Sequence, residues 1–215
     1  MIAVAEEGLP PSLAAGGSAA CLRVENLSFL DLGPFQFGVA HGECLGITGP
    51  SGSGKTLLLR ALADLDPHTG EVYLDGVAAG ALPAPHWRRQ VGLLPAESAW
   101  WADTVGAHFD GVAPPWLDRL GFGPEVLHWE VARLSSGERQ RLAFLRLLVG
   151  QPAVLLLDEP TANLDAQNTG RLEDLVRRYR EARAAAVVWV THDLDQLRRV
   201  ATRCRRLQNG RLEGS

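Results

Sequence analysis

The stretch Gly49-Pro-Ser-Gly-Ser-Gly-Lys-Thr56 matches the phosphate-loop pattern GxxxxGK[ST] at every position. Its glycines let the backbone curl until consecutive N–H groups point inward at an anion, and a helix that begins near Lys55 adds its positive N-terminal end. An apolar run at 43–48 predicts a strand before the loop, and leucines over 56–65 predict a helix after it. This context favours a phosphate site over the alternative, an ordinary glycine-rich turn.

Lys55 is the only lysine among the 21 lysine and arginine residues of the chain. Arginine is a wide planar fork, whereas lysine is a compact point charge that can fold back between two phosphates. We therefore expect Lys55 to reach the β- and γ-phosphates of ATP and the Thr56 hydroxyl to ligate Mg²⁺. The predicted ATP-binding residues of the loop are Gly49, Pro50, Ser51, Gly52, Ser53, Gly54, Lys55 and Thr56.

The overall composition excludes some function classes. The formal net charge of −4 argues against a nucleic-acid binder that relies on bulk positive potential. Cys21, Cys44 and Cys204 are far apart and form no CxxC pair, so we interpret them as buried or incidental thiols of a reducing compartment.

Neither a membrane span nor a secretory signal is evident. No apolar run reaches the ~18 residues that a membrane-spanning helix needs. Glu6 and Glu7 precede the first basic residue, Arg23, which is unlike a signal peptide. We therefore expect a cytoplasmic protein whose membrane role, if any, comes through a partner.

Strand-like and helix-like segments alternate along the chain. Further strands are expected at 22–29, 35–39, 70–76, 91–94, 153–157, 186–190 and 206–208, and further helices at 136–149, 167–184 and 194–201. Such alternation predicts an α/β fold with a mainly parallel sheet, here a P-loop NTPase core with an N-terminal antiparallel β portion.

Two regions differ from this alternation. Residues 1–20 are rich in Ala, Gly, Ser and Pro and predict a flexible tail, which leaves 21–215 as a single domain. Residues 97–150 contain a cluster of tryptophans and no clear strand. We expect this second region to form a small helical lobe.

Two acids end the run Ala153-Val-Leu-Leu-Leu-Asp-Glu-Pro160. Because the run is apolar throughout, it predicts a strand covered on both faces. Asp158 is then placed to hold Mg²⁺ through water, opposite Thr56, and Glu159 to polarise the water that attacks the γ-phosphate. Charged residues often end strands, but the complete phosphate loop earlier in the chain favours the catalytic interpretation.

The segment Leu134-Ser-Ser-Gly-Glu-Arg-Gln140 resembles the LSGGQ signature of ATP-binding cassettes. Over about residues 22–212 the chain is similar to the ATP-hydrolysing subunits of ABC transporters. A serine and a glycine at a helix N-terminus can form a second anion site. The resemblance implies that Ser135 and Gly137 contact the ATP of the opposite subunit in a head-to-tail dimer. The same residues also fit an ordinary N-cap with an acid in the first turn.

Other positions match the family as well. Ala162-Asn-Leu-Asp165 resembles the D-loop, which crosses the dimer interface, and His192 matches the switch histidine that contacts the γ-phosphate. The resemblance thus implies that His192 acts beside Glu159 in catalysis. Phe29, or Phe35 as its substitute, is the candidate aromatic residue for stacking on adenine, and either ring would equally suit the core.

The sequence departs from the family where a glutamine usually contacts Mg²⁺ and water and senses the membrane partner. In Val91-Gly-Leu-Leu-Pro-Ala-Glu97 this position is Ala96, and Glu97 could replace the glutamine only with a one-residue shift and an added negative charge. Hydrolysis is then expected to be slower or differently coupled. The adjacent Trp100 and Trp101 cannot both point into one helix face, so we expect at least one of them to be exposed. In the family this region receives the membrane subunit, so Trp100 or Trp101 either belongs to that docking surface or packs within the lobe.

These patterns together predict an ATP-hydrolysing subunit of an ABC transporter that uses ATP and Mg²⁺ and binds no nucleic acid. It is expected to form a homodimer when ATP is bound, to lie on the inner face of the cell membrane, and to drive a separate permease. One alternative is a soluble ABC-type ATPase that acts on DNA or ribosomes, although such relatives carry long insertions or tandem cassettes. The other is a slow nucleotide switch, which Ala96 keeps open.

Overall fold

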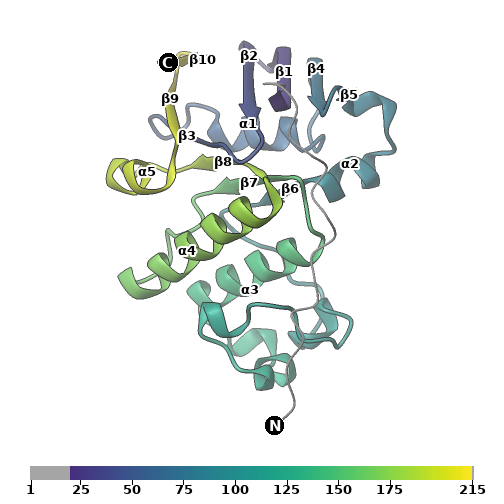
Figure 1. Ribbon diagram of the computed structural model, residues 1–215, viewed down its shortest axis with the longest axis vertical. Coiled ribbons are helices and arrows are strands. Elements are labelled where there is room, and N and C mark those ends of the chain that lie inside the picture. Colours follow the sequence, from purple (N-terminus) through teal and green to yellow (C-terminus); the bar gives the residue numbers. More distant parts are fainter. Residues whose placement is uncertain (1–19, 215) are drawn as a thin grey trace.

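The computed structural model describes residues 20–214. The predicted tail, residues 1–20, lies outside this range except for Ala20, where β1 begins. The strands are β1 Ala20–Phe29, β2 Leu32–Ala40, β3 Cys44–Thr48, β4 Thr69–Leu74, β5 Val77–Ala78, β6 Val91–Leu94, β7 Val154–Asp158, β8 Ala186–Val190, β9 Arg203–Gln208 and β10 Arg211–Glu213. The helices are α1 Lys55–Leu62, α2 Ala84–Gln90, α3 Ser136–Val149, α4 Ala166–Arg183 and α5 Leu194–Val200 (Figure 1).

A six-stranded sheet with the order β10-β9-β3-β8-β7-β6 forms the centre of the molecule. Its strands pair in parallel except for β10, which is antiparallel to β9. Every residue of β7 and β8 is buried, as expected for strands covered on both faces. The predicted α/β fold with a mainly parallel sheet is therefore confirmed.

Two hydrophobic cores lie on the two faces of this sheet, because alternate residues of a strand point to opposite sides. On one face, Leu156 and Val188 pack with α1 and with an antiparallel sheet of order β2-β1-β4-β5. On the other face, Leu155 and Val187 pack with α3, α4 and the lobe. Figure 1 shows these layers, with the antiparallel sheet above the central strands and α3 and α4 below them.

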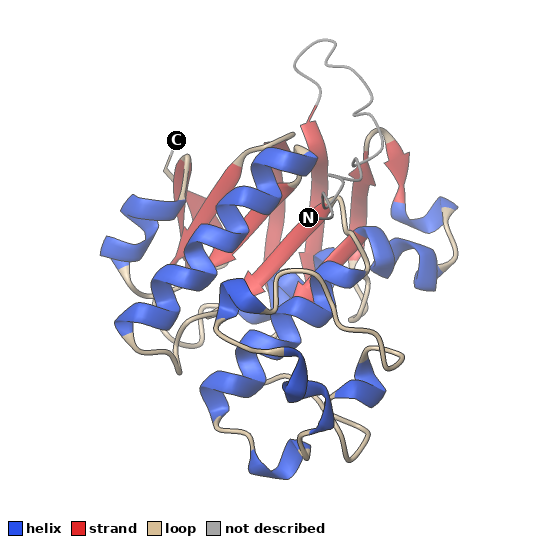
Figure 2. Cartoon of the chain, turned by 60° about the horizontal axis from the view of Figure 1, so that its bottom comes forward, coloured by secondary structure: helices blue, strands red, loops and turns tan. Residues whose placement is uncertain are grey.

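The segment predicted as a helical lobe, 97–150, contains α3 and short 3-10 turns in place of longer helices. These turns are Gly106–His108, Asp118–Leu120, Pro124–His128 and Val131–Arg133. Frequent proline and glycine in this segment interrupt helical hydrogen bonding, which keeps each turn short. Figure 2 shows these turns gathered around loops, away from both sheets.

The other differences from the predicted elements concern short segments. The sequence analysis missed α2, whose seven residues are too few to show a helical period; it is anchored by the buried Trp87, whose Nε1 donates to the Leu62 carbonyl at 3.0 Å. Helix α1 ends at Leu62, three residues earlier than predicted, and Asp64 has a positive φ of 54°. None of the helices in the described range is both long and apolar enough to cross a membrane.

Candidate functional site

The predicted site residues follow the carboxyl ends of neighbouring parallel strands. The phosphate loop follows β3, His192 follows β8, and Glu159 directly follows β7. In the sheet these strands are adjacent, in the order β3-β8-β7. Open α/β sheets bind their ligands outside the carboxyl ends of the strands, so the topology gathers segments far apart in sequence into one candidate site.

The phosphate loop is held by close backbone approaches that require glycine. A Cβ on Gly49 would clash with the Leu207 carbonyl oxygen, and a Cβ on Gly54 would clash with the Leu32 side chain. Gly54 also has a left-handed φ of 97° at the N-cap of α1. The structure thus shows the strand–loop–helix context that the motif requires, with α1 starting at Lys55.

The Lys55 ammonium group lies over this loop. Its Nζ donates hydrogen bonds to the carbonyl oxygens of Gly49 and Pro50, at 2.9 Å each. Pro50 and Ser51 are exposed, whereas the Ser53 hydroxyl is buried in the loop. A cation held across a curl of exposed backbone is suited to a polyphosphate anion.

Thr56 and Asp158, the two predicted Mg²⁺ ligands, are in direct contact. The Thr56 hydroxyl donates to Oδ2 of Asp158 at 2.7 Å. Asp158 is only 3% exposed, and burial raises the pKa of its carboxyl above the ordinary range. The Glu159 carboxylate raises this pKa further, whereas the Thr56 hydrogen bond and Lys55 oppose the shift. Carboxylate and hydroxyl oxygens are the hard ligands that Mg²⁺ prefers, so this pair fits the ion.

Glu159 and His192 form a second pair at the same edge of the sheet. Nδ1 of His192 and Oε1 of Glu159 are 3.0 Å apart, and the imidazole is the more exposed of the two side chains. Glu159 has a positive φ of 45°, and its N–H donates to the Val190 carbonyl at 2.9 Å. An uncommon backbone conformation at such a position is consistent with a functional constraint on where the carboxylate points.

A buried glutamine, missed by the sequence analysis, links the segments that carry this pair. Gln196 is 1% exposed, and its Nε2 donates to Thr161 Oγ1 at 2.8 Å and to Glu173 Oε1 at 2.9 Å. Its Oε1 accepts a hydrogen bond from Nε1 of Trp189 at 3.2 Å. Gln196 thereby ties the segment after Glu159 to the helix that follows His192. In the sequence, Gln196 is one polar residue among several in α5, so nothing indicated that it is buried and links these segments.

The signature residues lie at the N-terminus of α3. Ser135 is the N-cap and forms a capping box with Glu138: its Oγ accepts from the Glu138 N–H at 3.2 Å, and its own N–H donates to Oε2 at 2.8 Å. The Ser135 N–H is the main cause of the lowered pKa of the Glu138 carboxyl. Ser135 and Ser136 are exposed, so this helix end is open to solvent.

Gly137 brings the signature against the predicted D-loop. A Cβ at this position would lie 2.7 Å from the Asn163 carbonyl oxygen, so any larger residue would displace the loop. Asp165 ends the D-loop as the N-cap of α4, where it accepts from the Asn168 N–H at 2.8 Å. Gly137 therefore packs against the D-loop of the same chain, whereas the hydrogen bonds of Ser135 are made to Glu138.

The loop that lacks the usual glutamine borders a cleft of about 400 Å³. The cleft is lined by Ala96, Glu97, Ser98, Ser136, Arg139, Gln140 and Asn163. Gln140, from the signature helix, donates from Nε2 to the Pro95 carbonyl at 3.1 Å. An exposed carboxylate, Glu97, thus takes part in a cleft shared with the signature and the D-loop.

The aromatic residues predicted for adenine are largely buried. Phe29 and Phe35 stack on each other with ring centroids 5.4 Å apart, and both belong to the core. Stacking of Phe29 on adenine therefore stays a prediction, and its burial leaves little ring surface for a base. The adjacent Leu30, which the sequence analysis missed, is 83% exposed. It lies in the β1–β2 turn, and Leu32, the first residue of β2, packs against Gly54 of the phosphate loop.

Trp100 and Trp101 form an aromatic platform on the lobe. The buried His108 packs edge-on against both rings, with centroid distances of 4.7 and 4.6 Å, and the Arg146 guanidinium lies over both. His108 Nε2 accepts from the Trp101 N–H at 3.1 Å, and Nδ1 donates to the Thr104 carbonyl at 3.0 Å. Trp101 nevertheless remains 71% exposed, so the expectation of one exposed tryptophan is confirmed.

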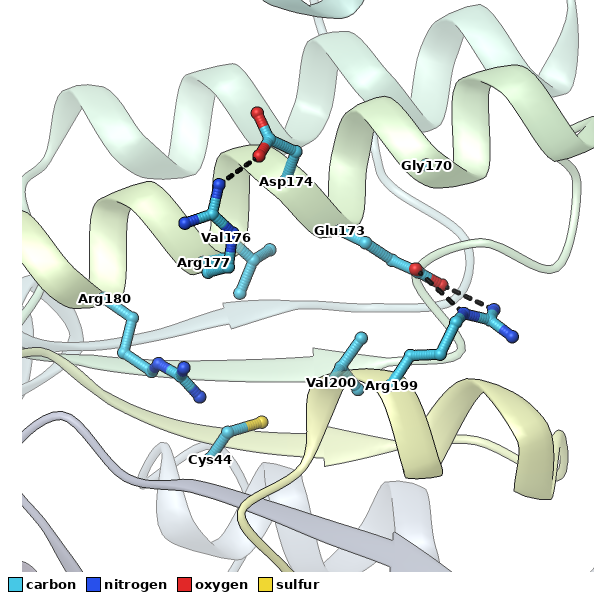
Figure 3. Close-up of a pocket in the computed structure, with 9 residues that line it drawn as sticks. All are labelled: Cys44, Gly170, Glu173, Asp174, Val176, Arg177, Arg180, Arg199 and Val200. Atoms are coloured by element: carbon cyan, nitrogen blue, oxygen red, sulfur yellow. Dashed lines mark hydrogen bonds and ion pairs between the residues drawn. The ribbon is translucent and has the colours of Figure 1, made fainter.

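A separate hollow of about 260 Å³ lies among α4, α5 and β3 (Figure 3). Its charged residues are largely paired, since Arg177 bonds to Asp174 and Arg199 to Glu173. The predicted nucleotide residues do not line it. We assign no nucleotide contact to this hollow.

Known proteins resemble this chain in both sequence and fold. Residues 32–162 match the family model described as ABC transporter. The chain is 33% identical to the probable iron export ATP-binding protein FetA of Escherichia coli (strain K12), over 82% of this chain and 86% of FetA. It is 36% identical to the lipoprotein-releasing system ATP-binding protein LolD of Pseudomonas syringae pv. tomato, over 86% of this chain and 89% of LolD.

A solved structure supports the architecture. The chain resembles a dimeric ATP-binding cassette in a post-hydrolysis state bound to ADP and Pi, with a TM-score of 0.77 and 24% identity. The match covers 90% of this chain and 97% of that one. At this level of identity the likeness concerns the fold, and it confirms the predicted P-loop cassette architecture.

Proposed function

The chain belongs to the ABC transporter family of ATP-binding proteins, and on that premise we propose specific roles for its site residues. The protein is an ATP-binding and ATP-hydrolysing subunit of an ABC transporter. The observation that carries the assignment of roles is the meeting of two pairs at one sheet edge, Thr56 with Asp158 and Glu159 with His192.

The loop around Lys55 holds the triphosphate. Backbone N–H groups of the loop and the Lys55 ammonium would neutralise the phosphate oxygens, and Thr56 and Asp158 would hold Mg²⁺. When bound, Mg²⁺ supplies positive charge that stabilises the negative charge developing on the phosphate oxygens. Phosphoryl transfer depends on such positioning and electrostatic stabilisation more than on covalent chemistry.

Glu159 positions the attacking water and accepts its proton. His192 donates to the Glu159 carboxylate and fixes its direction. The imidazole is exposed, so its remaining ring nitrogen is available to contact the γ-phosphate when ATP is bound. The backbone bond from Glu159 to Val190 holds the carboxylate relative to β8, from which His192 emerges. The two side chains therefore act as one positioned unit.

Ser135 and Gly137 bind the ATP of a second copy. The helix N-terminus at Ser135 is exposed and offers an anion site, and Gly137 packs it beside the D-loop, the segment expected to cross the dimer interface. In the variant Ser135→Arg, a monomer should bind ATP normally but fail to form the ATP-bound dimer in analytical ultracentrifugation. Lys55→Ala should abolish ATP binding itself, which separates the two defects. An ATP-bound dimer of Ser135→Arg as stable as the parent's would contradict the assignment.

The aromatic platform of Trp100 and Trp101 docks the membrane subunit, with Trp101 as the contact residue. An exposed indole that is backed by a buried histidine and a guanidinium is a rigid apolar contact of the kind enriched in interfaces. A permease bound here would hold the cassette at the inner face of the membrane. This docking accounts for the different environments of the two tryptophans, since Trp100 packs within the lobe and Trp101 is exposed.

A slow nucleotide switch is a second candidate, favoured by Ala96 and by the carboxylate of Glu97 in the adjoining cleft. An added negative charge near Mg-ATP weakens binding of the anion and alters the charge balance of the transition state. Steady-state turnover of the parent and of Ala96→Gln distinguishes the candidates. A transporter subunit limited by the missing glutamine should hydrolyse ATP faster after this substitution, whereas a dedicated switch should stay slow.

A further inference from the structure

Three strand ends bring a cysteine, a histidine and an aspartate together in the antiparallel sheet. Strand β1 lies between β2 and β4 and runs antiparallel to both (Figure 1). The start of β1 is therefore flanked by the ends of both neighbours, and Leu22 pairs with Leu74. Cys21 precedes Leu22, His41 directly follows β2, and Asp75 directly follows β4.

The side chains of this trio converge. The thiol of Cys21, a ring nitrogen of His41 and a carboxylate oxygen of Asp75 all lie within 4.8 Å of one another. Nε2 of His41 is 2.8 Å from Oδ1 of Asp75. The Asp75 N–H also donates to the Cys21 carbonyl oxygen at 2.9 Å, which fixes the two residues through the backbone.

The three donors differ in chemistry, and their combination points to one class of ion. Thiolate and imidazole are ligands of zinc and of softer transition metals, whereas Mg²⁺ and Ca²⁺ prefer oxygen donors throughout. A thiolate and a carboxylate together balance the charge of a divalent ion. Cys21 is buried while His41 and Asp75 are about half exposed, so one side of the trio is accessible to solvent.

The spacing is within reach of a tetrahedral site. Zinc bond lengths of ~2.3 Å to sulfur and ~2.0 Å to nitrogen place neighbouring ligand atoms about 3.5 Å apart. His41 and Asp75 would separate slightly from their 2.8 Å contact, and the sulfur already lies within 4.8 Å of both. Their exposure leaves these two side chains free to make such small adjustments.

We propose that Cys21, His41 and Asp75 bind one Zn²⁺ ion per chain, with water in the fourth position. The ion would add a shared ligand centre to three strand ends that backbone hydrogen bonds and the contact between His41 and Asp75 already hold together. Its effect is to brace the antiparallel sheet, because each ligand comes from a different strand end.

This site is distinct from the nucleotide site. His41 lies before β3, and the phosphate loop lies after it. The five residues of β3 separate the two by roughly 16 Å along the strand. The backbone next to His41 instead contacts the loop before β8, where the Gly42 N–H donates to the Ala184 carbonyl at 2.8 Å. Zinc binding should therefore proceed without nucleotide.

Titration of the tag-free full chain with Co²⁺ in the absence of nucleotide tests the proposal. Co²⁺ occupies zinc sites and gives a charge-transfer band when a thiolate ligates it. We expect one equivalent of Co²⁺ to produce this band and Zn²⁺ to abolish it by displacement. The variants His41→Gln and Asp75→Asn should weaken Zn²⁺ binding at least about tenfold, the loss that even an outer-shell partner of a metal ligand causes.

The controls use a cysteine and a histidine outside the trio. Cys204→Ser and His86→Ala alter exposed residues and should leave the band and the affinity unchanged. Cys21→Ser should remove the band. Because Cys21 is buried, the exposed His41 and Asp75 variants carry the test if that variant does not fold. A titration without a thiolate band, or unchanged Zn²⁺ affinity in both exposed variants, would overturn the proposal.

Discussion

Oε1 of Glu159 accepts a hydrogen bond from Nδ1 of His192 at 3.0 Å, across the ends of two neighbouring parallel strands. The contact joins residues 33 positions apart in the sequence. It exists because Asp158 and Val190 are paired in the sheet, so that the next residues of each strand emerge side by side. This pair, set beside the phosphate loop, is the basis of the catalytic assignment.

The role of His192 predicts a defect in turnover and not in stability. His192→Ala removes an exposed imidazole, so the melting temperature should stay the same, while kcat should fall about 10²-fold as the Glu159 carboxylate loses its orientation. KM for ATP should change little. His86→Ala, at another exposed histidine, serves as the matched control in the same ATPase assay. A His192→Ala enzyme with the parent's kcat would show that the contact is structural.

Asp158→Asn should have opposite effects on the stability of the nucleotide-free protein and on metal binding. Burial, with help from Glu159, raises the pKa of Asp158, so its ionised form destabilises the folded state. A neutral amide should raise the melting temperature measured without nucleotide, and each ~1 kcal/mol of added stability would appear as about 2–4 °C in a chain of this size. This gain should fade as the pH falls through the raised pKa, where the parent's carboxyl takes up a proton.

The same variant should lose the stabilisation that Mg-ATP gives the parent. Thermal melts with and without Mg-ATP measure both effects. Asp118→Asn, on the exposed surface of the lobe, should change neither. If Mg-ATP stabilised Asp158→Asn as strongly as the parent, Asp158 would not be a metal ligand.

Trp101→Ala should weaken docking to the membrane subunit without affecting the isolated cassette. Truncation of a central aromatic anchor costs about 2 kcal/mol or more of binding free energy, so recovery of the complex should fall at least tenfold. Co-purification with the membrane subunit measures this loss, and basal ATPase activity should stay constant. Leu194→Ala, at an exposed leucine of α5, is the control. Equal recovery for Trp101→Ala and the parent would assign the indole to the lobe alone.

The chemistry of each motif could be predicted from the sequence, because the residues that carry it are contiguous in the chain. The run from Gly49 to Thr56 contains its own glycines, lysine and hydroxyl, and the acids after 153–157 follow a strand that is visibly apolar. The strands and helices around them were predicted to within a few residues, since burial on both faces gives uninterrupted apolar runs.

Relationships that depend on strand order were not readable. The contact between Gln196 and Thr161 requires β7 and β8 to be neighbours, and the trio that contains Cys21 requires the register of three antiparallel strands. Leu30 is exposed and Phe29 is buried because β1 ends between them, and the apolar pattern does not fix the position of that strand end to one residue. The spacing of residues along the chain does not predict these contacts or the exposure of Leu30.

The substitution Glu159→Gln tests the central assignment most directly. Glutamine keeps the size of the side chain but cannot accept the proton of the attacking water, so single-turnover hydrolysis should slow by about 10²–10⁴-fold. ATP affinity should be retained, and the variant should accumulate as an ATP-bound dimer. Glu125→Gln, at an exposed position of the lobe, should behave like the parent. If Glu159→Gln hydrolysed ATP at the parent's rate, Glu159 would not be the residue that activates water.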